Sequence, residues 1–113
     1  MLDQDDDSAL LRRQKQFLQQ VEFELRRINR RIIHEHIPEL NRDRFVALAG
    51  FVAEIRSRYL RAALALSAFR PGSAEAEDAL AALERERRSF EECVAAFAAL
   101  ERAIEQGYVD IQR

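Results

Sequence analysis

Hydrophobic residues follow helical spacing in three long stretches of the chain, and two breaks separate the stretches. Each set recurs at steps of three, four or seven residues, which places its members on one side of a helix. The first set comprises Leu11, Leu18, Val21, Leu25, Ile28 and Ile32. The second set comprises Phe45, Leu48, Val52, Ile55, Tyr59, Ala62, Leu66 and Phe69. The third set comprises Ala76, Leu80, Leu83, Arg87, Phe90, Val94, Phe97, Glu101 and Ile104.

Proline, glycine and capping residues predict where the helices end. Pro38 disfavours helical geometry at the residue before it, and Pro71-Gly72 interrupts the second pattern. Ser73 is a typical N-cap, and Gly107 is a typical terminator. We therefore predict helices over about 9–37, 42–69 and 74–106, with an acidic tail at 1–8 and a second tail at 107–113.

Two short connections between three long helices predict an all-α domain spanning residues 1–113. Neighbouring helices become antiparallel, and a period near 3.5 favours shallow crossing angles. The expected architecture is an up-down-up bundle of three helices that packs as a homodimer. In the competing interpretation, Pro38 only kinks one helix over 9–69 and opens the chain for a swapped dimer. The apolar pattern slips by one residue at Pro38, which favours a true break.

The second helix is apolar around most of its circumference, because a further stripe includes Val46, Ala53, Leu60 and Leu64. A helix that is apolar nearly all round is normally surrounded by other chains or helices. Either a second chain covers this stripe, or its alanines tolerate exposure. Phe23 and Ile33 also lie away from the first helix's apolar stripe. The six residues together are the predicted partner interface.

Charged residues predict a polar layer across the middle of the bundle. Glu24, Arg56, Glu86 and Arg87 fall at similar heights when residues are counted from the turns. Buried charges persist when they are paired. The layer sets the register of the helices or anchors a small polar site, unless both arginines extend their stems to solvent.

Charge is segregated along the chain, whose formal net charge is −2. Residues 9–70 contain thirteen basic and six acidic side chains, whereas residues 71–113 contain five and ten. A candidate basic patch comprises Arg26, Arg27, Arg30, Arg31, Arg42 and Arg44. Such a patch suits phosphates, but the acidic segments favour the alternative that basic and acidic helices complement one another.

No residue pattern indicates a catalytic, cofactor or metal site. His34 and His36 are two residues apart, so on a helix their rings point in opposite directions and cannot share one ion. Cys93 is the only cysteine. The longest apolar run, 45–53, is short of the roughly 20 residues of a membrane span, so we expect a cytoplasmic protein. The seventeen arginines against one lysine are typical of a bacterial, GC-rich genome.

These patterns predict a non-catalytic helical module for protein interaction and oligomerisation, such as an adaptor, assembly factor, chaperone-like protein or regulator. Its expected partners are a second copy of itself and another protein. One alternative is a nucleic-acid-associated regulator that uses the basic hairpin of the first two helices. A third, an enzyme with a mid-bundle Arg/Glu site, has the least support.

Overall fold

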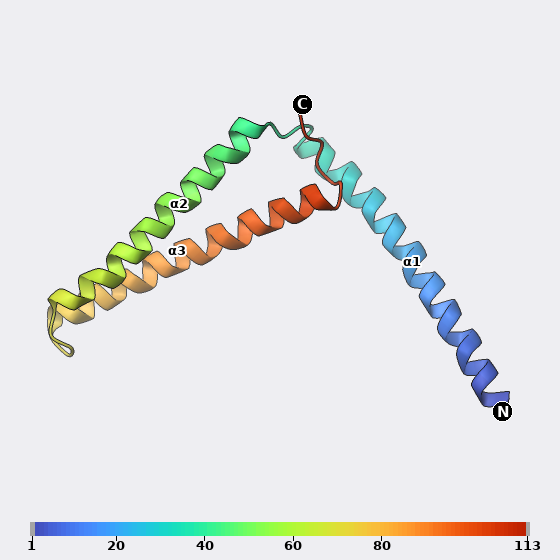
Figure 1. Cartoon of the computed structure of the whole chain (residues 1–113), viewed down its shortest axis with the longest axis horizontal. Coiled ribbons are helices and arrows are strands. Elements are labelled where there is room, and N and C mark those ends of the chain that lie inside the picture. The colour runs from blue at the N-terminus through green and yellow to red at the C-terminus, as the bar shows by residue number, and fades with distance from the viewer. Residues whose placement is uncertain (1, 113) are drawn as a thin grey trace.

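A computed structural model describes residues 2–112, and this part of the chain is all-α (Figure 1). Helix α1 spans Leu2–His36, α2 spans Arg42–Ala65 and α3 spans Ala74–Glu105. A short 3-10 helix, η1, follows α2 at Leu66–Ala68. The only extended pairing within residues 2–112 is an isolated bridge between Leu40 and Ile111. The predicted helical class and the three helices are therefore confirmed.

The ends of the helices lie close to the predicted positions, because local interactions determine them. α1 ends before Pro38, and Asn41 caps α2 by accepting a hydrogen bond from the Arg44 amide at 2.7 Å. Ser73 caps α3 by accepting from the Ala76 amide at 3.1 Å. Gly107 adopts a φ of 75°, a left-handed conformation that ends α3.

Helix α1 starts earlier than predicted and includes most of the segment expected to be an acidic tail. It begins at Leu2, so Asp5, Asp6 and Asp7 lie within its first two turns. Carboxylates near a helix N-terminus interact favourably with the positive end of the helix dipole. The acidic residues thus extend the helix instead of preceding it.

Helices α2 and α3, joined by η1 and the turn at 69–73, pack against each other as an antiparallel hairpin (Figure 1). Val52, Ile55 and Ala76 are buried between them. Two aromatic pairs bridge the helices: Phe45 with Phe97, at 4.9 Å between ring centroids, and Tyr59 with Phe90, at 5.5 Å. The predicted apolar stripe of the second helix is therefore the one that faces α3.

Helix α1 does not fold back onto this hairpin, so the single chain does not form the expected up-down-up bundle. In Figure 1, α1 projects away from the α2–η1–α3 hairpin, and among the described residues it makes no helix packing contact with α2 or α3. The radius of gyration is 23.3 Å, whereas a compact domain of this length has about 13 Å. The molecule is therefore extended.

The continuous, kinked helix of the competing interpretation is not seen either, because residues 37–41 interrupt the helix. The chain is nevertheless open at this break. None of the three described helices is both long enough and apolar enough to cross a lipid bilayer.

Candidate interaction surfaces

The apolar stripe of α1 faces solvent along its whole length. Between residues 4 and 36, every side chain is exposed except Ala9, Asn29 and Ile33, which are half-buried. Leu18 in the middle of the stripe retains 64% of its accessible surface. We use the name α1 stripe for Leu11, Leu18, Val21, Leu25, Ile28 and Ile32. This stripe has the spacing of a buried helix face but no partner within the described chain.

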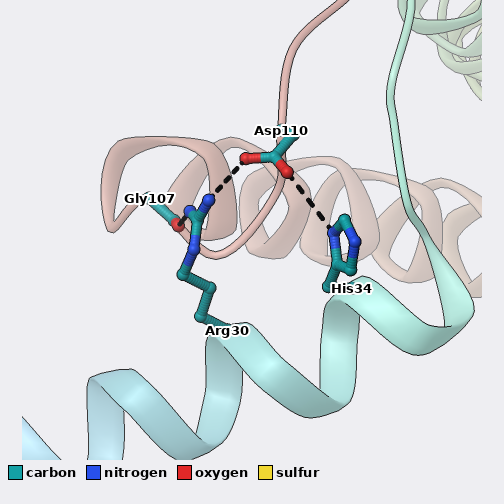
Figure 2. Close-up of polar contacts among 4 residues, drawn as sticks. All are labelled: Arg30, His34, Gly107 and Asp110. Atoms are coloured by element: carbon teal, nitrogen blue, oxygen red, sulfur yellow. Dashed lines mark hydrogen bonds and ion pairs between the residues drawn. The ribbon is translucent and has the colours of Figure 1, made fainter.

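The C-terminal segment 107–112 holds the end of α1, and we call these contacts the C-terminal clamp (Figure 2). The Arg30 guanidinium donates to the Gly107 carbonyl oxygen at 2.6 Å and to Asp110 Oδ1 at 2.8 Å. The other carboxylate oxygen, Asp110 Oδ2, lies 3.3 Å from His34 Nδ1. Asp110 thus joins two side chains that are one helical turn apart on α1.

Main-chain contacts complete the clamp. The Leu40 amide donates to the Asp110 carbonyl at 2.8 Å, and the Gln112 amide donates to the Leu40 carbonyl at 3.0 Å. Leu40 and Val109 are both buried. The clamp therefore combines apolar burial with backbone pairing, and it orients α1 at the point where the chain leaves for α2.

The sequence did not predict this clamp, because residues 107–113 read as a tail. Val109 and Ile111 alternate with polar residues, which is the pattern of a short extended segment. That alternation indicates an extended segment but not its partner. The partner is the loop at Leu40, some 70 residues earlier, and a loop has no periodic pattern by which to recognise it.

Most arginines of the predicted basic patch already face carboxylates. Arg26 lies 3.4 Å from Glu22, Arg27 lies 3.6 Å from Glu24, and Arg42 lies 3.9 Å from Asp43. Arg30 is held by Asp110, as described above. Arg27 and Arg31 line an open depression of about 710 Å³ beside Asp110. Arg44 lies at the start of α2, apart from this depression. The patch is thus divided, and acidic groups are interspersed with it.

The four residues of the predicted polar layer are not brought together in the single chain. Glu24 pairs within α1, as noted above, and Arg87 lies 3.8 Å from Glu91 within α3. The Arg56 guanidinium stacks 5.3 Å from the centroid of the Phe90 ring. Glu86 pairs instead with Arg58, at 2.8 Å.

Glu86 is the most enclosed carboxylate of this group, because its side chain is only 20% exposed. Arg58 binds one of its oxygens, while the other, Oε2, is buried without a hydrogen-bond partner. The sequence pattern does not single out Arg58. The Arg58–Glu86 pair marks one side of the hairpin as polar.

The opposite side of the hairpin carries most of the large apolar side chains that α2 and α3 expose, together with Arg56, Arg87 and Glu91. On α2, the predicted second stripe is open to solvent: Val46, Leu60 and Leu64 are exposed. On α3, the predicted apolar set divides into two rows. Its members Leu83, Phe90 and Phe97 are half-buried towards α2, whereas Leu80 and Val94 are exposed. At about 100° per residue, the α3 row lies on the same side as the α2 stripe.

We use the name hairpin face for this surface, which comprises Val46, Ala53, Leu60, Leu64, Leu80 and Val94. Of the other predicted interface residues, Phe23 is exposed on α1 and Ile33 is half-buried near the clamp. Both lie outside the α1 stripe.

Within residues 2–112, no three His, Cys, Asp or Glu side chains are placed to hold one metal ion. Comparison of the chain with models of protein families, with curated proteins and with solved structures finds no match.

Proposed function

We propose that the protein is a non-catalytic helical module for interaction and oligomerisation, and that it works as a homodimer. The observation that supports this function is the unpartnered apolar surface of α1 and of the hairpin face. A helix in a protein gains most of its stability from packing its apolar side against another element. α1 has such a side along its length, and a second polypeptide is what would cover it.

The amount of exposed surface supports the same proposal. The chain exposes 9546 Å², whereas a compact monomer of its 13.1 kDa mass exposes about 6,400 Å². Stable interfaces between proteins bury roughly 1,200–2,000 Å² in total. The surplus of one chain thus exceeds what a stable dimer requires.

Light scattering on the purified chain at about 50 µM tests the proposal, since that concentration populates even a weak-to-moderate dimer. We expect twice the chain mass of 13.1 kDa. A monomer at this concentration would contradict the homodimer and would favour the interpretation that the alanine-rich stripe of α2 tolerates water.

A matched pair of substitutions locates the interface on α2. Leu60 and Phe51 are equally exposed, at 55% and 56%, but Phe51 lies on the other side of the helix. Leu60→Arg places a charge in the proposed interface twice per dimer, once for each copy. Because burial of one leucine contributes about 1.5–3 kcal/mol, the dissociation constant should rise at least about a hundredfold. Phe51→Arg should leave it unchanged.

A further inference from the structure

The clamp keeps α1 away from its own hairpin. Arg30, His34 and Leu40 are all bound by residues 107–112, which pass between the end of α1 and the end of α3 (Figures 1 and 2). For α1 to fold back along α2, these contacts would have to break and the buried Leu40 and Val109 would become exposed. The same contacts stay intact if α1 packs against another molecule.

The hairpin face offers a third helix one continuous exposed surface. The exposed stripe of α2 and the exposed row of α3 lie side by side along the line of contact between the two helices. Arg56, which stacks on Phe90 across the helix pair, and the Arg87–Glu91 pair lie on this side too, so both sides of the hairpin carry charged groups. The hairpin face differs in carrying most of the large apolar side chains that α2 and α3 expose, whereas Phe51 lies on the side of the Arg58–Glu86 pair.

The α1 stripe matches the hairpin face in length. Leu11 and Ile32 are 21 positions apart, hence about 32 Å at 1.5 Å per residue. The 24 residues of α2 extend over about 36 Å. One α1 stripe therefore covers one hairpin face with little left over at either end.

The charges of α1 and α3 are opposite, whereas α2 is basic like α1. Residues 9–36 carry seven basic and three acidic side chains, α3 carries four and nine, and α2 carries five and two. Of the two helices of the hairpin, α3 is therefore the one whose charge complements that of α1.

We infer that α1 of one copy packs on the hairpin face of a second copy, and that the exchange is reciprocal. The dimer then contains two three-helix units, each built from two chains, and the clamp directs each α1 outwards to its partner. This inference rests on the proposed homodimer but specifies more, since a dimer could also form through α1 against α1. In that arrangement the repulsion between two basic helices would oppose association.

Paramagnetic relaxation in a mixed dimer separates the two arrangements. In a Cys93→Ala background, Gln20→Cys carries a nitroxide on the exposed side of α1, away from the stripe. The spin-labelled chain contains nitrogen at natural isotopic abundance and is mixed with ¹⁵N-labelled wild-type chain. Only the amides of the wild-type chain are then observed, so broadening of their signals reports contacts between copies. A diamagnetic analogue is the reference, and a second label at Gln16→Cys repeats the measurement from another position.

With the exchange, we expect broadening of α2 and α3 amides in the labelled copy. A dimeric mixture in which broadening is confined to α1 amides would overturn the exchange and leave the proposed homodimer intact. A monomer by light scattering would overturn the proposed function and, with it, this inference.

A pair of α3 variants provides an independent measurement by analytical ultracentrifugation. Val94→Arg places a charge within the proposed interface, and we expect it to raise the dissociation constant roughly tenfold or more. Ala96→Arg, also exposed but on the opposite side of α3, should leave association unchanged. Equal association of both variants would show that α3 does not line the interface and would overturn the exchange.

Discussion

At the scale of single residues, the contacts that decide the shape of this protein are few, polar and mostly exposed. Asp110 connects to both Arg30 and His34, and Arg58 covers one oxygen of Glu86. Exposed ion pairs contribute little to stability, but the same pair contributes more when one partner is enclosed. The exposed fraction of the side chains thus determines how much each of these ion pairs contributes to stability.

Asp110→Ala removes the side-chain part of the clamp. Because Asp110 and Arg30 are 39% and 55% exposed, the free energy of unfolding should fall by no more than about 1 kcal/mol. The local effect should be larger: the amides of Leu40 and Gln112 should exchange with deuterium several-fold faster. Arg88→Ala, which removes a remote exposed pair on α3, is the control. Unchanged exchange at both amides would mean that backbone pairing alone maintains the clamp.

Arg58→Ala tests the enclosed ion pair. Without Arg58, the Glu86 carboxylate is enclosed but unpaired, so we expect the free energy of unfolding to fall by about 1 kcal/mol. The loss is smaller than for a fully buried ion pair because the Arg58 side chain is exposed. The control is Arg88→Ala, whose pair with Glu84 is of similar length, 2.9 Å, but exposed on both sides. Urea denaturation should show less than about 0.5 kcal/mol for Arg88→Ala. Equal losses would contradict the role of enclosure.

At the scale of elements, the helices end where backbone geometry requires it. Gly107 terminates α3 with a positive φ, after which the Tyr108 amide donates to the Ala103 carbonyl at 2.8 Å. This turn sends residues 108–112 back towards α1 instead of onward along α3. The terminator of one helix therefore positions the segment that orients another.

Gly107→Ala should destabilise the protein by about 1–2 kcal/mol, the cost of placing an L-residue in the left-handed region. Nothing lies within 4 Å of the added methyl group, so the cost arises from the backbone alone. Gly50 has equally open surroundings but lies within α2. Gly50→Ala should thus stabilise by up to about 1 kcal/mol. Thermal denaturation of both variants, with opposite expected shifts, checks this prediction.

At the scale of the whole molecule, the charge distribution favours a protein partner over nucleic acid. The patch arginines have carboxylates beside them, and α3 is acidic. We therefore expect no detectable binding to duplex DNA, even at low salt. If four to six arginines did bind phosphates, the log–log dependence on salt would have a slope of roughly −4 to −5. A gel shift that is lost on Arg27→Glu with Arg30→Glu would support the nucleic-acid alternative.

The sequence by itself determined the helical class, the breaks near Pro38 and at Pro71-Gly72, the cap at Ser73, and the stripe of α2 that faces α3. These features depend on interactions between residues within a few positions of one another, which leave a periodic or positional pattern. Phe23, Ile33 and the α2 stripe remain predictions as interface residues, since one chain does not test them.

Only the tertiary structure decided the direction of α1, and with it the absence of an up-down-up bundle in the single chain. The deciding contacts join residues 77 and 80 positions apart, Arg30 with Gly107 and with Asp110. Periodicity records which side of a helix is apolar, but not which surface meets it. The same apolar stripe can pack within one chain or against a second copy. The clamp decides between these two arrangements, because its contacts hold α1 away from its own hairpin.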